Sequence, residues 1–430
     1  TVWVRHAVCD STATLAECLP PSDDTSDALL MLLTGLCARL RRESAIELLA
    51  PLATAIRSVA RELSSDEIGK VLKDGASIPA LGAVLSSTLA ASSSSSSGQN
   101  GHASNGNNGG AEGDFPAILA ALFSALGAVA SAAMDLFAPF AVDAIAPVLQ
   151  VLRARCGDTT AGIRPETLTA EVLAACLEAS GSVLAAAWAE PGFQKAREDL
   201  VLLAHRLLPE TALPSNVRAA LHLFFASMAL AAFEDFRPHL QPALSAASHS
   251  FAVAAAAGEA KSGRRAVRTG GQEELVAAIT AVGAYAIAVG AHFAPHIQAT
   301  LPSVCSHAQN PDAKVRTAVA ESIERFGRML GGLGEQLGPG PSQDRLFASE
   351  VARGLAMALL TLLGHQDGGA SALRMALMVK EDLLQCQGFV ELLGPDMVQQ
   401  LSSACNGRSS DDVESSDGGD DDDEDDNEDM

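Results

Sequence analysis

The sequence predicts an all-α superhelix in which pairs of helices stack side by side along the chain. The composition is 48% hydrophobic but only 4% aromatic, and an apolar set dominated by Ala and Leu favours closely packed helices over sheets. Two short signatures, Val-Arg followed by Ala and Phe-x-Pro, also recur along the chain. Such recurrence is typical of repeats that each bury one face against the next repeat.

The spacing of the two signatures indicates the type of repeat. Val-Arg opens three Ala- and Leu-rich segments and places Arg5, Arg218 and Arg316 at equivalent positions. Prolines near the predicted helix starts follow one another from Pro139 to Pro395 at steps of 46 to 57 residues. This period is slightly longer than usual for HEAT and armadillo repeats, and it predicts a HEAT/armadillo-type repeat solenoid.

Apolar periodicity then places the helices in order. The predicted helices are 2–18, 25–42, 46–62, 66–73, 78–91, 115–134, 138–154, 167–188, 192–208, 215–232, 237–257, 273–291, 294–308, 312–331, 343–364, 369–385 and 389–404. The clearest start is at Asn310, Pro311 and Asp312, which suit an N-cap, the first helical position and the first turn. The segment that follows has one apolar and one charged face, as a helix in a stacked pair requires.

We expect one solenoid over residues 1–406, followed by an acidic, disordered segment over 407–430. A Ser-, Gly- and Asn-rich stretch at 92–114 is too polar to fold and is predicted to be a disordered insertion. A second loop, 258–271, is rich in Gly and basic, with Arg264, Arg265 and Arg268. A third, Gly- and Pro-rich loop is expected at 332–341.

The net charge of −23 is unevenly distributed. Residues 411–430 hold 13 acidic and no basic side chains, which is about half of the imbalance. The densest run is Asp420, Asp421, Asp422, Asp423, Glu424, Asp425 and Asp426. Like charges keep such a run unfolded, so it is either a solvated tail or a polyanion that attracts basic proteins. An acidic chain is a poor binder of nucleic acid, and none is expected as a direct partner.

Chemical motifs are sparse in this sequence. The eight cysteines form no Cys-x-x-Cys pair and fall mostly in apolar helical runs, which indicates free thiols and neither disulfides nor a zinc site. We find no nucleophile elbow, phosphate-binding loop or zinc-protease motif. The sequence therefore predicts a protein that is not an enzyme and needs no metal or cofactor.

Two apolar stretches, 117–134 and 275–311, lack charged side chains. They are rich in Ala, Gly and Ser, and the second contains three prolines. These features favour buried solenoid helices over membrane spans, so no membrane insertion is expected.

The two signatures are predicted to be structural. Arg5, Arg218 and Arg316 would form a ladder, each bonded to a carboxylate or to helix-end carbonyls of the adjacent repeat, with Asp312 as one possible partner. The alternative is contact with a ligand. In the second signature, the aromatic residue would anchor the corner between two helices and the proline would set the direction of the next helix; these residues are Phe137, Pro139, Phe236, Pro238, Phe293 and Pro295.

Three passages together resemble the importin β (karyopherin β) superfamily, most closely the importin-4/importin-5 type. The most specific is Glu273–Leu330, which joins a small-residue helix, a Phe-Ala-Pro-His corner and a Val-Arg-Thr-Ala-Val-Ala-Glu-Ser helix. Ala120–Leu149 and Val217–Leu244 are looser copies. The position of the acidic segment after the repeats also fits this family. One departure is the loop at 258–271, which is basic where this type often has an acidic insertion.

The resemblance implies a nuclear import receptor that shuttles between cytoplasm and nucleus through the nuclear pore. Such receptors bind basic cargo, including histones and ribosomal proteins, and contact Phe-Gly nucleoporins through apolar grooves between outer helices. The GTPase Ran, which releases cargo, mainly contacts N-terminal repeats that this chain is expected to lack, with further repeats also expected after the acidic segment. The alternative is a HEAT-repeat scaffold for another assembly, such as a phosphatase, a condensin-like complex or tubulin.

Overall fold

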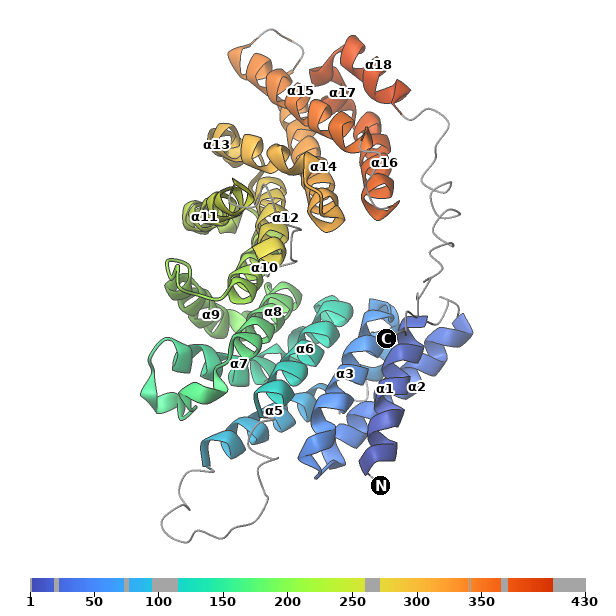
Figure 1. Cartoon of the computed structure of the whole chain (residues 1–430), viewed down its shortest axis with the longest axis vertical. Helices are drawn as coiled ribbons and strands as arrows, with labels where there is room; N and C mark the ends of the chain where they lie inside the picture. The colour runs from blue at the N-terminus through green and yellow to red at the C-terminus, as the bar shows by residue number, and fades with distance from the viewer. Residues whose placement is uncertain are drawn as a thin grey trace, which may run out of the picture. The chain divides into compact units, whose positions relative to one another are not determined.

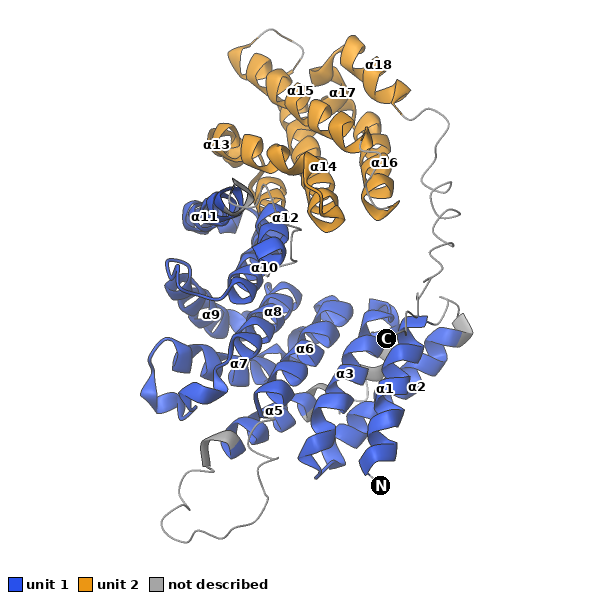
Figure 2. Ribbon diagram, viewed as in Figure 1, with its two compact units in different colours: residues 1–281 blue, residues 282–430 orange. Residues whose placement is uncertain are grey.

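The computed structural model consists of α-helices and short 3-10 helices (Figure 1). It describes residues 2–18, 23–72, 77–94, 115–259, 271–338, 340, 342–364 and 370–404, and no strand occurs among them. The all-α prediction is therefore confirmed for this part of the chain. Contacts divide the chain into two compact units, residues 1–281 and 282–430 (Figure 2).

The first unit stacks its helices in two rows. Its elements are α1 (Val2–Cys18), α2 (Asp23–Arg42), η1 (Ile46–Leu48), α3 (Leu49–Arg61), α4 (Ser65–Leu72), α5 (Ser77–Ser94), α6 (Phe115–Ala133), η2 (Met134–Phe140), α7 (Ala141–Arg155), η3 (Thr159–Ala161), η4 (Pro165–Thr167), α8 (Ala170–Ala187), η5 (Pro191–Phe193), α9 (Gln194–Leu207), α10 (Ser215–Ala232), η6 (Phe233–Phe236), α11 (Arg237–Glu259) and the start of α12 (Gly271–Val289). In the first-helix row, α2, α5, α7 and α9 pack in sequence, and α11 follows α9 along the chain. The second-helix row contains α3, α6, α8 and α10 (Figure 1).

Neighbouring helices of the second-helix row approach each other through small residues. Gly127 in α6 lies against Ala179 in α8, where an added Cβ would come within 3.1 Å of the Ala179 Cα. One repeat later, Gly181 in α8 lies against Phe224 in α10, with an added Cβ 3.3 Å from the Phe224 Cα. Backbones this close leave no room for larger side chains, which explains the abundance of Ala and Gly in these helices.

The corners of the Phe-x-Pro signature share one local structure. Phe137 and Phe236 are fully buried, each in the 3-10 turn that follows a second-row helix. Three residues before each of them, Met134 and Phe233 adopt left-handed backbone angles, with φ of 48° and 49°. Most non-glycine residues avoid this region, so two of the corners hold a strained residue.

The second unit continues the same pattern. It contains the end of α12, η7 (Gly290–Phe293), α13 (Ala294–Cys305), η8 (Ser306–Gln309), α14 (Ala313–Leu337), α15 (Gln343–Leu363), α16 (Ala370–Gln385), α17 (Gln387–Leu393) and α18 (Pro395–Ser403). At its corner, Phe293 is fully buried, and Gly290 occupies the strained position with φ of 54°.

Two boundaries in this unit were predicted wrongly. The expected helix 389–404 is two helices, because Gly394 takes a φ of 79° and Pro395 starts α18. The expected loop at 332–341 begins later, because α14 continues to Leu337. Gly331 in that helix faces Cys386, which precedes α17, and Gly334 faces Gly388 within α17. The glycines therefore serve close packing instead of ending the helix.

The predicted insertion and loops lie mainly outside the described residues. Helix α5 extends to Ser94, so the start of the 92–114 insertion was placed too early, and residues 95–114 are not described. Likewise, α11 reaches Glu259 and α12 begins at Gly271, which takes both ends of the 258–271 loop into helices. The acidic segment 407–430 lies wholly outside the described residues.

The apolar segments and cysteines are used in packing. Five described segments are long and apolar enough to cross a membrane by length and composition, and 44 to 67% of each apolar window is buried inside the structure. The seven cysteines among the described residues are free; Cys9, Cys37 and Cys176 are buried. Burial raises the pKa of the Cys176 thiol far above its usual value and that of Cys305 to about 12.

Candidate partner-binding site

A cavity of about 520 Å³ opens beside α9, α10 and α11 in the first unit. Its lining comes from the end of α9, the turn after it, one side of α10 and the middle of α11. The lining residues are His205, Leu208, Pro209, Glu210, Thr211, Leu213, Arg218, Leu221, His222, Pro242, Ser245, Ala246, His249 and Ser250. The cavity therefore lies where one repeat of the first-helix row follows another.

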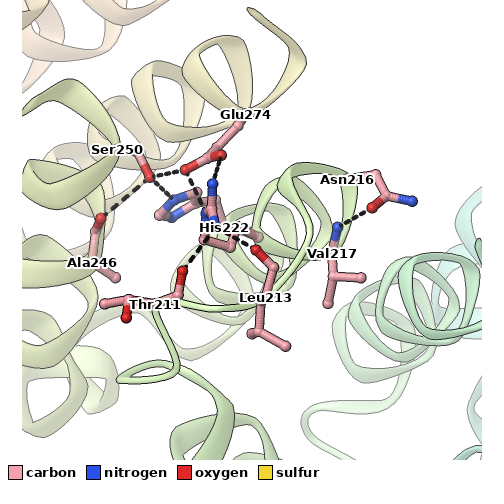
Figure 3. A network of polar contacts seen from close by, with 9 residues as sticks. Thr211, Leu213, Asn216, Val217, His222, Ala246, Ser250 and Glu274 are labelled. Atoms are coloured by element: carbon pink, nitrogen blue, oxygen red, sulfur yellow. Dashed lines mark hydrogen bonds and ion pairs between the residues drawn. The ribbon is translucent and has the colours of Figure 1, made fainter. Parts of the chain in front are cut away.

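Arg218 ties three segments together at the floor of this cavity. Its Nε and Nη2 atoms donate to the two carboxylate oxygens of Glu274 in α12, at 2.8 and 2.7 Å. Its Nη1 atom donates to the carbonyl oxygens of Thr211 and Leu213 in the preceding turn (Figure 3). A bidentate pair of this kind fixes direction as well as distance, so α12 and the turn are held against α10.

The Glu274 carboxylate is buried, with 3% of its side chain exposed. Burial alone would raise its pKa, but hydrogen bonds from Arg218 and Ser250 and the charge of Arg218 hold the pKa below its usual value. The hydrogen bond to Glu274 in turn raises the pKa of Arg218. The pair is therefore charged over the whole neutral range.

His222 and Ser250 extend the network (Figure 3). The Ser250 hydroxyl donates to Glu274 at 2.6 Å, and the Nε2 atom of His222 lies 2.9 Å from the Ser250 Oγ. Because the serine proton points to the carboxylate, the histidine Nε2 is the donor to Ser250. Burial lowers the pKa of His222 to about 4, against the pull of Glu274.

This network does not build a catalytic serine. The Ser250 hydroxyl is buried and donates its proton to a carboxylate already paired with Arg218, so no base is placed to activate it. Among the described residues, no group of three or more His, Cys, Asp or Glu side chains could hold a metal ion. What remains is a rigid polar floor beneath Leu208, Leu221, Pro242 and Ala246, which suits an apolar or aromatic side chain.

A pair of histidines borders the cavity. The Nε2 atom of His205 lies 2.7 Å from the Nδ1 atom of His239, and the ring of His205 packs edge-on against Phe225. Burial lowers the pKa of both histidines, and each one's charge would oppose the other's. Both are therefore neutral at physiological pH, so the charges that line the cavity include the Arg218–Glu274 pair and Glu210, which is paired with Arg155.

The other two signature arginines have different surroundings. The Nη1 atom of Arg5 lies 3.0 Å from Glu43, whose side chain is 2% exposed and also receives Arg39. Arg316 is 2% exposed and donates to the carbonyl oxygens of Asn310 and Pro311, at 2.6 and 2.9 Å. Asp312 was considered as its partner, but its carboxylate instead accepts from the Lys314 backbone N–H at 2.8 Å and caps α14.

Of the remaining predicted site residues, the structure describes the prolines but not the acidic run. Pro139 lies in η2, whereas Pro238 and Pro295 are the second residues of α11 and α13. The acidic run 420–426 lies outside the described residues. The sequence alone did not identify Glu274, Ser250 and His222 as partners of one network, since 56 residues separate Arg218 from Glu274.

Comparison with known proteins gives a fold but no close relative. No protein-family model and no curated protein matches the sequence. The crystal structure of Kap121p matches with a TM-score of 0.59 and 14% identity, over 93% of this chain and 36% of that chain. Importin beta in a polyethylene glycol condition matches with a TM-score of 0.56 and 13% identity, over 90% of this chain and 42% of that chain.

A third structure, Kap121p bound to Nup53p, matches with a TM-score of 0.59 and 14% identity, over 93% of this chain and 35% of that chain. At such low identity the likeness shows the fold alone. The chain is therefore a HEAT-type helical-repeat solenoid of the kind seen in karyopherins, and it spans roughly a third to two fifths of these solved structures.

Proposed function

We propose that this chain is part of a nuclear transport receptor of the importin β superfamily, of the importin-4/importin-5 type. It has no enzymatic activity and shuttles between cytoplasm and nucleus. The observation that carries this proposal is the solenoid likeness to Kap121p over 93% of the chain. Its partners are basic cargo proteins such as histones or ribosomal proteins, Phe-Gly nucleoporins and, through repeats outside this chain, Ran.

The cavity beside α9 and α11 supports the nucleoporin part of this proposal. Its volume of about 520 Å³ accommodates an aromatic side chain and flanking backbone, and its rim is formed by Leu208, Pro209, Pro242 and Ala246. A Phe side chain buried there would gain roughly 1.5–3 kcal/mol. Kap121p has been crystallised with Nup53p, which makes a nucleoporin a reasonable partner to test.

Two serines on α11 offer a matched test. Ser245 lines the cavity and Ser248 does not, although both are exposed. We expect Ser245→Asp to weaken binding of a Phe-Gly peptide severalfold, because the new carboxylate would lose hydration when Phe enters. Ser248→Asp should bind the Phe-Gly peptide as the parent does. A Ser-Gly peptide should bind neither the parent nor the two variants. Equal binding by both variants would move the nucleoporin site elsewhere.

The acidic segment supports the proposal that this chain binds basic cargo. Its 13 carboxylates would speed the association of a basic protein and give an affinity that weakens with salt. Changing residues 420–426 to Asn and Gln keeps the length and removes the charge. We expect histone tails to bind this variant more weakly at low salt than the parent. If neither chain binds histone or ribosomal-protein tails at low salt, the scaffold alternative is favoured over an import receptor.

A further inference from the structure

A second, more polar cavity of about 320 Å³ lies on the second-helix row, where α3, α6 and α8 meet. Its small-residue wall comes from α6, where no lining side chain is larger than serine. The polar lining residues are Arg57, Arg61, Glu178, Ser124, Ser131 and Ser182. The cavity exists because α6 and α8 present Gly, Ala and Ser opposite two long arginines of α3.

The two arginines hold unused hydrogen-bond donors. The Nε atom of Arg57 is buried and has no hydrogen-bond partner. Within the described part of the chain, no hydrogen bond and no ion pair within 4.0 Å joins Arg57, Arg61 or Glu178 to a partner, although the charges of both arginines act on Glu178 across the cavity. A buried donor without a partner costs free energy, and a ligand that accepts its hydrogen bond recovers that cost.

The charges favour an anionic ligand. Arg57 and Arg61 lie four residues apart on one helix, so their guanidinium groups emerge on the same face one turn apart. Glu178 brings one negative charge, and loss of hydration raises its pKa even though Arg61 and Arg57 act to lower it. Two planar donor forks beside Ser124, Ser131 and Ser182 are typical of carboxylate or phosphate recognition.

We propose that this cavity binds an oxyanion carried by a peptide side chain, either the carboxylate of a glutamate or the phosphate of a phosphoserine, in a partner segment that lies across α3, α6 and α8. Arg57 and Arg61 hold the oxyanion, and the serine hydroxyls complete its hydrogen bonds. This goes beyond the proposed function, because basic cargo and Phe-Gly repeats are proposed above to bind through positive charge and aromatic side chains, and not through an oxyanion. A partner could therefore be anchored at this point by one acidic residue.

The test uses three labelled peptides on the full chain, followed by fluorescence anisotropy. They share a neutral Gly- and Ser-based sequence and differ at one central residue, which is Glu, phosphoserine or Gln. We expect the phosphoserine and Glu peptides to bind and the Gln peptide to bind at least tenfold more weakly. The ratio between the two acidic peptides tells which oxyanion the site prefers.

Substitutions of the two arginines and of Glu178 should change the affinity for the acidic peptides in opposite directions. Arg57→Gln with Arg61→Gln should weaken binding of the acidic peptides at least tenfold, whereas Glu178→Gln should strengthen it severalfold by removing the opposing charge. Arg41→Gln with Arg42→Gln, at the exposed end of α2, removes the same charge outside the cavity and should leave binding nearly unchanged. Ser131→Leu fills the cavity without changing any charge and should block binding.

Reversed signs would overturn the proposal, because weaker binding of the acidic peptides to Glu178→Gln would mean that Glu178 supports peptide binding instead of opposing it. Equal binding of the Gln peptide would also overturn it. If the double arginine variant loses its helical circular dichroism, Glu178→Gln and Ser131→Leu still decide the outcome. The nucleoporin test concerns the cavity beside α9 and α11, so failure of either experiment leaves the other interpretable.

Discussion

At the scale of single residues, the polar network around Arg218 shows how a buried charge is tolerated in an Ala- and Leu-rich solenoid. The side chain of Glu274 is only 3% exposed, yet its negative charge is paired with Arg218, and its oxygens accept hydrogen bonds from Arg218 and Ser250. Removing one member leaves the other charged and dehydrated, which costs far more than the intact pair contributes.

Arg218→Gln is therefore expected to lower the free energy of unfolding by about 3 kcal/mol. Urea unfolding followed by circular dichroism would measure this change. The control is Arg153→Gln, which breaks the exposed pair of Arg153 with Asp199 and should cost less than about 1 kcal/mol. Equal losses in the two variants would mean that the Arg218–Glu274 pair is no more important than a surface contact.

His222 makes the stability depend on pH. Its pKa is about 4 in the folded chain and 6.5 in the unfolded chain, so protonation favours unfolding. The stability is fully present above pH 6.5 and is lost as the pH falls toward 4. Between pH 7 and pH 5 the loss should be about 2 kcal/mol, and His222→Gln should remove it. Part of the slope will remain, since His205 and His239 also have lowered pKa values.

The sequence singled out Arg218 as a recurring residue, but it did not predict the partners of Arg218 or the cavity beside it. The repeated Val-Arg pair showed that an arginine recurs at one position, because repeats copy local sequence. Glu274, Ser250 and the cavity depend on how α10, α11 and α12 come together, and no local pattern records that packing. Arg316 illustrates the limit: like Arg218 it donates to carbonyl oxygens of the turn before its own helix, but only Arg218 of the two is paired with a carboxylate among the described residues.

At the scale of elements, the close approach of helices from neighbouring repeats depends on glycine. Gly283 in α12 faces Ser322 in α14, where an added Cβ would lie 3.1 Å from the Ser322 Cα. The same role for Gly127 and Gly181 in the first unit shows that it belongs to the repeat and not to one site. A side chain at such a position would push two backbones apart.

Gly283→Ala should therefore lower the free energy of unfolding by about 1–3 kcal/mol, despite the better helix propensity of Ala. Gly35 is the matched control, because it lies within α2 and an added Cβ would meet nothing within 4 Å. Gly35→Ala should raise the stability by about 0.5–1 kcal/mol. Stabilisation by both variants would show that the close approach is easily relaxed.

The corner after α10 offers a gain in stability. Phe233 has a φ of 49° and is 63% exposed, so its side chain contributes little packing while its backbone is strained. Phe233→Gly should raise the free energy of unfolding by about 1 kcal/mol, measured by urea titration. Phe233→Ala keeps the Cβ and should change it by less than about 0.5 kcal/mol. If glycine destabilises the corner, the exposed ring has a structural role.

Most helices were predictable because their apolar stripes and caps are local. The predicted helix 215–232 coincides with α10, and 2–18 coincides with α1. The errors fall where tertiary contact overrides the usual meaning of glycine. Gly331 and Gly332 read as a helix end but lie within α14, whereas Gly394 was included in a helix and instead separates α17 from α18.

At the scale of the whole molecule, stability comes from contacts between neighbouring repeats, so an apolar stripe that no described residue covers stays in contact with water. Helix α1 shows this on one stripe, where Val4, Val8 and Leu15 are 62%, 58% and 52% exposed. Trp3 beside them is 85% exposed. Exposed apolar stripes of this kind promote association between molecules.

We expect the chain to self-associate with rising concentration in analytical ultracentrifugation, because α1 can bury this stripe against a second molecule. Val4→Gln, Val8→Gln and Leu15→Gln together should shift the chain toward the monomer without loss of helical signal. As a control, Leu346→Gln removes a side chain that is 69% exposed on α15 and should leave association unchanged. Association unaffected by the triple change would place the contact on another surface.

The buried cysteines can serve as natural reporters of local opening in this chain. A thiol reacts with an alkylating reagent only as an accessible thiolate, and Cys9, Cys37 and Cys176 are sealed within α1, α2 and α8. Each can be modified only after its own part of the stack has opened, whereas exposed Cys18 reports the unhindered rate. Alkylation rates at these positions therefore give the free energies of local opening. The local stability of individual repeats can thus be measured without adding a probe.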